Sequence, residues 1–360
     1  MEIIFAIIFI FSLLILITLH EFGHFILAKK FGVKVEEFGI GIPPRIFGKK
    51  IGETVYSLNL LPLGGFVKIL GEEERVDDPR SFNKKPVWQR ASILLAGCLS
   101  FWIISAILLS VVMNFGVPRA VSDDFNQGSL PAKVQIIAVA PRSPAEETGL
   151  RAGDIIKEVI INGSKFEIQK VKEIIDLTEA NKGEEIILTI ERGREVFEAN
   201  LIPRISPPEG EGPIGVALTR RIIESYPWYQ APFKGISATG DLTVLTIQGW
   251  FGVLKNLFQG LPIKVVILGP IGATKEAAKI GQLGISYFLQ FIAMVAVSVG
   301  LFNLLPIPAL DGGRLLFLVI EKIKKEPISQ RLEQKINSFF FILLIALIIW
   351  ISAKEIISLF

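Results

Sequence analysis

The sequence predicts a polytopic α-helical membrane protein with four transmembrane helices, a membrane-associated β-hairpin region and an inserted α+β domain. Of the 360 residues, 51% are hydrophobic, and they gather in long blocks. Charged residues return in the middle of the chain, where short apolar runs alternate with turn residues, as in a folded water-exposed domain. The net charge of +3 is too small to indicate a nucleic-acid partner, so none is expected.

Four blocks carry no charge over a length that can cross a bilayer, whose core of about 30 Å needs about 20 apolar residues of helix. These blocks predict transmembrane helices within residues 1–30, 91–115, 281–314 and 336–358. The first helix is expected to be retained, because it has neither the basic start nor the small-residue cleavage site of a secretory signal.

Lysine and arginine gather between the first two helices and after the third. The positive-inside rule therefore predicts that residues 31–90, a cytoplasmic or membrane-reentrant β region, and the loop 315–335 face the cytoplasm. Both chain termini and the long segment between the second and third helices are then expected outside.

Residues 117–205 are predicted to form the inserted domain, with strands over 133–140 and 184–193 and a short amphipathic helix over 168–180. The stretch "PRSPAEETGLRAGDIIKEVIING", residues 141–163, resembles a PDZ domain of bacterial proteases, with P-x-S-P-A, G-L, G-D-x-I and I-N-G in order. A tight turn alone would explain "GLRAGD" but not its flanks. PDZ domains bind peptides as an added strand, so a peptide or a substrate C-terminus is an expected partner.

Residues 206–280 are predicted to hold a Pro/Gly linker and an amphipathic helix with apolar residues from Phe233 to Phe258. Only 13 uncharged residues separate Asp241 from Lys255, too few to cross a bilayer. A helix lying on the membrane surface is predicted, and a helix packed beneath the PDZ domain is the alternative.

The only two histidines of the chain, His20 and His24, stand one helical turn apart in the first hydrophobic block, and Glu21 follows the first of them. At this spacing two imidazoles project from one helix face about 6 Å apart and can reach one zinc ion. Glu21 is then close enough to take a proton from a water molecule on the metal. H-E-x-x-H is a zinc-metalloprotease signature, and ionisable groups in a membrane helix are costly unless they are functional.

A catalytic zinc ion usually has three protein ligands. The chain has no third histidine, and its single cysteine, Cys98, stands alone in the middle of the second helix, so a carboxylate is expected. Asp311 is the best candidate, since it is the first charge after the third hydrophobic block. The first and third helices run in the same direction, which brings both motifs to one depth. The alternative for "ALDGG" is a turn that ends a helix.

With these motifs, the chain resembles the site-2 protease family of intramembrane zinc metalloproteases, of the bacterial regulator-of-sigma-E protease type with one PDZ domain. The resemblance covers nearly the whole chain and rests on "HEFGH", "NLLPIPALDGG", "FGVKVEEFGIGIPP", "LPLGGFVKILGE", "SFNKKPVWQR" and "LGPIGATKEAAK". It implies one zinc ion per chain on His20, His24 and Asp311, Glu21 as general base and acid, and Asn303 as a group that helps to hold the substrate backbone.

The resemblance also implies cleavage of peptide bonds in or near transmembrane segments, in the bacterial cytoplasmic (inner) membrane, with the active site near the cytoplasmic side. Single-pass proteins such as anti-sigma factors, or remnant signal peptides, are the implied substrates. Residues 54–70 are predicted to form a β-hairpin that dips into the membrane, where an edge strand could pair with an unwound substrate. Gly64, Gly65 and Phe66 are its candidate substrate contacts, and a plain cytoplasmic hairpin is the alternative.

Two positions depart from the family pattern, because Cys98 and Phe101 stand where relatives usually have Pro and Asn. This questions a substrate-binding role of the second helix but not the zinc site. The alternative function is a membrane-anchored PDZ adaptor with a non-catalytic zinc site, and the presence of Glu21 and of a third ligand favours the protease. A zinc-dependent transporter is disfavoured because the helices show no repeated halves. The sequence leaves open whether the PDZ domain is a size filter or a peptide sensor.

Overall fold

The structure, a computed structural model, describes residues 2–72, 74, 76–125, 131–193, 195–260, 268–326 and 328–357. Residues 126–130 of the predicted PDZ domain, residues 261–267 of the predicted surface-helix segment, residue 327 of the predicted loop and residue 358 of the predicted fourth helix lie outside the described residues. The chain divides into two compact units. The helical unit comprises Ile3–Ser110, Pro232–Ala277 and Phe291–Phe360, and the β unit comprises Met1–Glu2, Val111–Ala231 and Ala278–Gln290.

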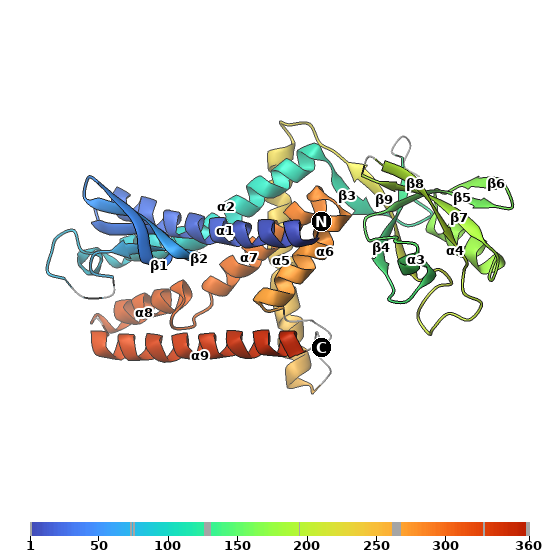
Figure 1. Ribbon diagram of the computed structural model, residues 1–360. Helices are drawn as coiled ribbons and strands as arrows, with labels where there is room; N and C mark the ends of the chain where they lie inside the picture. The colour runs from blue at the N-terminus through green and yellow to red at the C-terminus, as the bar shows by residue number, and fades with distance from the viewer. Residues whose placement is uncertain are drawn as a thin grey trace. The chain divides into compact units, whose positions relative to one another are not determined.

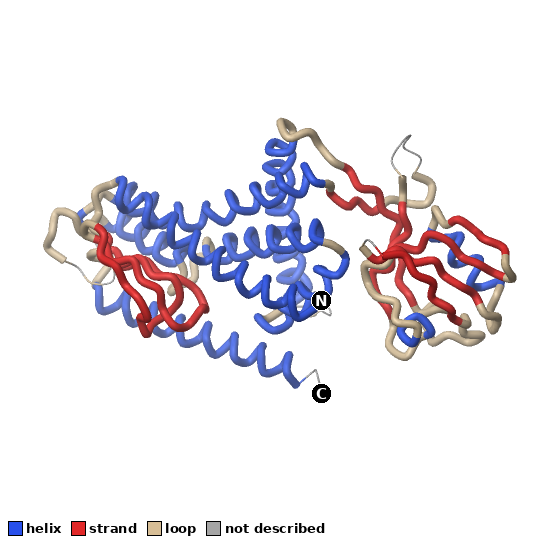
Figure 2. The backbone as a smooth tube through the Cα atoms, turned by 45° about the horizontal axis from the view of Figure 1, so that its top comes forward, coloured by secondary structure: helices blue, strands red, loops and turns tan. Residues whose placement is uncertain are grey.

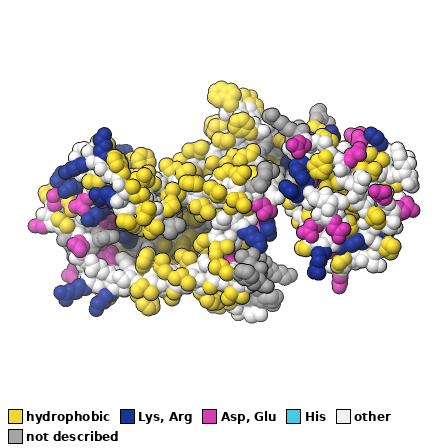
Figure 3. All heavy atoms as spheres, viewed as in Figure 1, with side chains coloured by type: hydrophobic (Ala, Val, Ile, Leu, Met, Phe, Trp, Pro, Cys, Tyr) yellow, Lys and Arg dark blue, Asp and Glu magenta, His cyan; other side chains and the backbone are white. Residues whose placement is uncertain are grey.

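Four of the described helices are long and apolar enough to cross a membrane: α1 (Glu2–Lys30), α2 (Val87–Phe115), α7 (Ile285–Asn303) and α9 (Gln330–Ile357). In the helical unit α1 and α7 run in one direction and α2 and α9 in the other (Figure 1). On the face shown in Figure 3, hydrophobic side chains predominate along these helices, whereas lysine and arginine side chains gather at the end that carries the strands β1 and β2. The prediction of a protein with four transmembrane helices is confirmed.

The third membrane helix, α7, ends at Asn303, close to the end of the uncharged block of the sequence at Leu305. A separate helix, α8 (Asp311–Lys324), begins at the expected metal ligand, within the predicted span 281–314. Pro306 and Pro308 explain the break, since proline has no N–H to donate and disfavours helix in the residue before it. The predicted loop 315–335 therefore contains most of α8 and the start of α9.

The helix α5 (Ala231–Phe258) packs along α2 within the helical unit. The indole Nε1 of Trp102 donates to the hydroxyl of Thr243 at 3.0 Å, and the hydroxyls of Ser105 and Thr239 lie 3.4 Å apart. A Cβ atom on Gly235 would collide with the backbone of α2, so glycine permits the close approach. The sequence predicted the helix itself, and the structure adds its packing against α2. A further helix, α6 (Pro270–Leu283), lies in a region that was not predicted to be helical.

The strands β1 (Val35–Ile51) and β2 (Thr54–Ile69) form a curved sheet in the helical unit (Figure 2). They meet at a tight hairpin where Ile51 pairs with Thr54. Further along, Glu37 pairs with both Val55 and Lys68, so the first part of β1 lies between two parts of β2. The sequence predicted that residues 54–70 form a β-hairpin by themselves, but they form the single strand β2, and its hairpin partner is β1. β1 was not predicted as a strand, because prolines, glycines and acidic residues are depleted in strands and are frequent in β1.

The β unit contains a sheet with the strand order β3-β9-β4-β5-β7-β8, and β6 pairs with β5. Two short helices, α3 (Pro144–Glu147) and α4 (Val171–Ala180), accompany the sheet. Its core includes the fully buried Ile136, Ile156 and Leu188. The strands are β3 (Val117–Ala120), β4 (Lys133–Val139), β5 (Ile155–Ile161), β6 (Ser164–Glu167), β7 (Ile186–Arg192), β8 (Glu195–Leu201) and β9 (Val216–Glu224). This is the α+β architecture expected of the inserted PDZ domain.

The sheet extends beyond the predicted end of the domain at residue 205. β9 pairs with β3 on one side and β4 on the other, although its residues were assigned to the segment after the domain. The Pro/Gly-rich stretch before it is a loop inside the domain, bound back by hydrogen bonds from Arg204 N to Pro213 O and from Ala145 N to Ile214 O. Proline and glycine mark such loops as well as linkers, so composition alone misplaced the boundary.

Candidate active site

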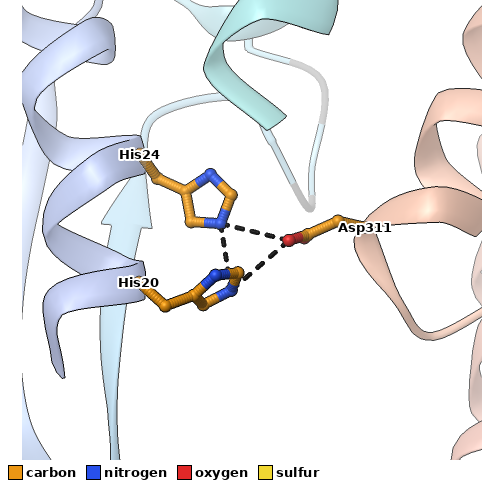
Figure 4. A group of neighbouring side chains, drawn as sticks. All are labelled: His20, His24 and Asp311. Atoms are coloured by element: carbon orange, nitrogen blue, oxygen red, sulfur yellow. Dashed lines mark hydrogen bonds and ion pairs between the residues drawn. The ribbon is translucent and has the colours of Figure 1, made fainter. Parts of the chain in front are cut away.

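Three polar side chains converge inside the helical unit (Figure 4). His20 and His24 come from α1 and Asp311 from the first turn of α8, and both histidines are buried. The Nε2 atoms of the two histidines lie 3.3 Å apart, and each lies 3.3 Å from Oδ2 of Asp311. In the part of the chain that the structure describes, this is the cluster whose donor atoms could hold a metal ion.

The spacing of the three donor atoms fits zinc. Three atoms separated by 3.3 Å form one face of a regular tetrahedron. The centre of a tetrahedron lies at about 0.61 of the edge length from each corner, here about 2.0 Å, which is the usual length of bonds from zinc to imidazole nitrogen and carboxylate oxygen. A catalytic zinc site has three protein ligands and a water molecule or the substrate in the fourth position, and the cluster supplies three ligands.

The neighbouring helix α2 orients both imidazole rings. Nδ1 of His24 lies 2.8 Å from the carbonyl oxygen of Ile93. Because a carbonyl only accepts hydrogen bonds, Nδ1 must donate, which leaves the lone pair of Nε2 for a metal. The ring of His20 stacks on Phe101 with centroids 5.0 Å apart and planes inclined by 22°. These contacts fix the direction of each Nε2 atom before any metal binds.

Two glycines let α1 and α2 approach closely enough for these contacts. A Cβ atom on Gly23 would collide with the backbone of Ala96, and a Cβ atom on Gly97 would overlap the ring of His24. Small residues serve the same purpose at other helix contacts in membranes. Gly97 therefore has a direct role in the site, since any larger residue would occupy the space of the His24 ring.

The carboxylate of Asp311 is placed by the turn that starts α8. Backbone carbonyls of residues 304–307 pass so close to Gly312 and Gly313 that neither position has room for a Cβ atom. The Sγ atom of Cys98 lies 3.5 Å from Oδ2 of Asp311 and can donate its proton to it. The sequence had placed Cys98 apart from the site, and the structure corrects this, because the face of α2 that carries Cys98 is turned toward the cluster.

Glu21, the candidate general base, contacts β2. Its Oε2 atom accepts a hydrogen bond from the backbone N–H of Val67 at 3.1 Å. This contact could not be foreseen, because a backbone N–H carries no signal in the sequence. It connects the helix of the metal ligands directly to the β sheet.

The candidate substrate-binding residues lie in two places: Gly64, Gly65 and Phe66 on β2, and Asn303 at the end of α7. A Cβ atom on Gly64 would lie 3.6 Å from Ile17, and a Cβ atom on Gly65 would lie 3.5 Å from Thr18. Both glycines therefore lie close to α1, about one turn before the histidines. The ring of Phe66 lies over Gly39 of β1. Asn303 is the last residue of α7, and its side-chain amide donates to the carbonyl of Val299 at 3.1 Å. The structure gives no hydrogen bond between Asn303 and the three donor residues.

Together, the fold and the site define a multi-pass membrane protein with a cluster of two buried histidines and one carboxylate that could hold a metal ion, beside a glutamate. That class is the membrane-embedded metalloprotease. Comparison with protein families matches "Peptidase family M50" over residues 8–347, and the chain belongs to this family.

Relatives match over almost the full length. A protein of Clostridium perfringens named as a zinc metalloprotease is 35% identical, with 99% of each chain covered. A zinc metalloprotease so named in Clostridium acetobutylicum is 33% identical over 95% of this chain and 94% of its own. The regulator of sigma-E protease RseP of Escherichia coli is 30% identical over 94% of this chain and 96% of its own.

Among solved structures, the PDZ domain of an SdrC-like protein from Listeria monocytogenes is 23% identical, covers 26% of this chain and 93% of its own, and has a TM-score of 0.22. Family and relatives establish that the protein is an intramembrane zinc metalloprotease, a multi-pass protein of the inner membrane.

Proposed function

We propose that His20, His24 and Asp311 hold the single zinc ion and that Glu21 is the general base and acid of peptide hydrolysis. The observation that supports this most directly is the triangle of donor atoms with 3.3 Å edges. Zinc in this position supplies Lewis-acid chemistry, lowering the pKa of water and polarising the scissile carbonyl group.

Glu21 carries the proton transfers. Its carboxylate takes a proton from the attacking water while the water oxygen bonds to the carbonyl carbon, and it then passes that proton to the amine nitrogen as the C–N bond breaks. One carboxylate oxygen accepts the N–H of Val67 at 3.1 Å, which fixes the group and leaves the other oxygen for the proton. Burial of the site beside the histidines excludes bulk water and strengthens these interactions.

We infer that substrates are single-pass membrane proteins or remnant signal peptides. Their transmembrane segment must unwind to expose a peptide bond, and the sheet of β1 and β2 beside Glu21 offers strands with which an unwound segment could pair. Gly64, Gly65, Phe66 and Asn303 remain the candidate contacts. The lysines at the end of α1 favour a site near the cytoplasmic surface, with both termini and the PDZ domain outside.

The test of the ligand set and of the base uses two substitutions in the full-length protein. Glu21→Gln is expected to retain one zinc ion per chain and to lose cleavage of a reporter transmembrane protein, because glutamine cannot take the proton. Asp311→Ala is expected to lower the zinc content. Normal turnover by Glu21→Gln would refute its role, and full zinc content in Asp311→Ala would show that another group is the third ligand.

The PDZ domain is proposed to control access, either as a size filter or as a sensor of a new substrate C-terminus. Because β9 belongs to the same sheet, the deletion that tests this must remove residues 117–224 and not stop at 205. Cleavage of substrates that still carry a large outer domain would support the filter. Unchanged selectivity would exclude it. A zinc-binding adaptor without hydrolysis, the alternative function, predicts that no reporter is cut by the wild type.

A further inference from the structure

Helix α8, which begins at Asp311, is tied to the rest of the helical unit by two ion pairs. Near its start, Arg314 pairs with Glu72 in the segment after β2. Two turns later, Glu321 pairs with Arg90 at the start of α2. The two α8 residues are seven positions apart, so they lie on one face of the helix. Both pairs border the same cavity, of about 440 Å³.

The pair of Arg90 and Glu321 has the geometry of a rigid joint. Two guanidinium nitrogens of Arg90 donate to the two carboxylate oxygens of Glu321, at 3.0 and 2.5 Å. The side chains are only 11% and 22% exposed. A bidentate pair with little solvent holds both partners in one relative orientation, and lysine cannot reproduce the planar fork of arginine.

The joint connects the two elements that orient metal ligands. Arg90 stands less than one turn before Ile93, whose carbonyl fixes the ring of His24 at 2.8 Å. Glu321 belongs to the helix whose first residue is Asp311. The N-cap residue Leu310 adds no side-chain hydrogen bond to the start of that helix. A shift of α8 along α2 would therefore separate Asp311 from His24.

We propose that Arg90 and Glu321 are positioning residues that hold α2 and α8 in the register at which His24 and Asp311 meet at one metal ion. This inference rests on the proposed function, because it takes these two residues as zinc ligands. It assigns the pair to the affinity of the zinc site and not only to the stability of the fold.

The experiment measures zinc affinity of the full-length protein in detergent by competition with a chelator, well below the unfolding temperature. Glu321→Gln and Arg90→Gln are each expected to weaken binding by about 10–100-fold, the usual cost of removing a group that supports a metal ligand. The double variant is expected to be no weaker than either single variant, because each single substitution already breaks the joint. Lys84→Gln is the matched control, since it removes the exposed ion pair of Lys84 and Asp77 and should leave affinity unchanged.

A second measurement separates positioning from general destabilisation. In zinc-free protein, the N–H groups of Gly313 and Arg314, which donate to the carbonyl of Leu310, are expected to exchange with solvent faster in Glu321→Gln than in the wild type. A general loss of stability would instead accelerate exchange across α1 and α2 as well. If a glutamine variant does not fold, Arg90→Lys keeps the charge, removes the fork and is expected to weaken zinc binding at least tenfold.

Three results would overturn the inference. The first is wild-type zinc affinity in folded Glu321→Gln or Arg90→Lys, and the second is a loss of zinc affinity in the double variant that equals the product of the losses in the two single variants. The third is faster hydrogen exchange of backbone N–H groups spread evenly over the helical unit. Asp311→Ala in the same assay separates this from a failure of the proposed ligand set. Wild-type affinity in Asp311→Ala rejects the ligand. Weak binding in Asp311→Ala with wild-type binding in Glu321→Gln rejects only the positioning pair.

Discussion

Replacing Gly97 by alanine tests the geometry of the site with a single methyl group. The methyl carbon would overlap three ring atoms of His24, and even the farthest of them, Cδ2, would lie 2.7 Å away where ordinary contacts begin at 3.4 Å. The ring must therefore move by more than the difference of 0.7 Å. Functional groups tolerate displacements of about 0.5 Å, so Nε2 of His24 is expected to move out of bonding distance of a metal ion held by His20 and Asp311.

The stability of the protein is expected to change little, which makes zinc affinity the decisive quantity. Overpacking costs about 1–3 kcal/mol. Alanine in place of glycine inside a helix returns about 1 kcal/mol. The free energy of unfolding should thus fall by about 0–2 kcal/mol, whereas zinc affinity should fall by about 100-fold or more, at the upper end of the loss seen when support of a ligand is removed.

The assay is chelator competition on the purified full-length protein, with thermal unfolding measured in parallel. Gly240→Ala in α5 is the matched control, because a Cβ atom there meets nothing within 4 Å. It should gain helix stability and bind zinc as the wild type does. Wild-type zinc affinity in Gly97→Ala would refute the reasoning, since it would mean that the ring of His24 can move aside without loss of a ligand.

Two further substitutions test the surroundings of the site and the PDZ domain. Phe101→Ala removes a side chain that is 1% exposed and stacks on His20. The free energy of unfolding should fall by about 3–5 kcal/mol, as thermal unfolding would show. Zinc affinity should also fall, as chelator competition would show. Asp154→Asn removes a carboxylate that is 1% exposed and accepts a hydrogen bond from Nε of Arg192 at 2.6 Å. Breaking this buried ion pair should lower the free energy of local unfolding of residues 133–224 by about 3–5 kcal/mol, which limited proteolysis of the full chain would detect. Zinc affinity should not change.

The residues that we propose as zinc ligands and general base were indicated by the sequence, because their signal is local or unique. His20, His24 and Glu21 follow one another within a single helical turn, and the scarcity of histidine and cysteine left a carboxylate as the third ligand. The structure places Asp311 3.3 Å from both histidines, a proximity that the sequence predicted without knowledge of α8. Pro306 and Pro308 indicated where α7 breaks, but the two glycines after Asp311 lower helix propensity and concealed the helix that follows.

The groups that hold those residues were not predictable. The carbonyl of Ile93 and the N–H of Val67 are backbone atoms, and Gly97 acts through the absence of a side chain. The membrane helices are apolar on all sides, so hydrophobic periodicity does not tell which face of α2 meets α1. In the PDZ domain, by contrast, alternating strands and turn residues predicted the strands β4 and β7, and the last strand was lost because its loop had the composition of a linker.

Phe101, one of the two positions expected to differ from the family pattern, lies on the face of α2 that contacts His20 of α1. Ile93, Gly97 and Phe101 are spaced by four residues and lie on the face of α2 toward α1. The carbonyl of Ile93 contacts Nδ1 of His24, Gly97 leaves room for the ring of His24, and the ring of Phe101 stacks on His20. The ring of Phe101 thus stacks on the ring of His20, and an asparagine at this position would lose this stacking. Helix α2 therefore supports the rings of both histidines. We propose that a peptide in the site finds its backbone partners elsewhere, and β2, which reaches Glu21 through the N–H of Val67, is the candidate element.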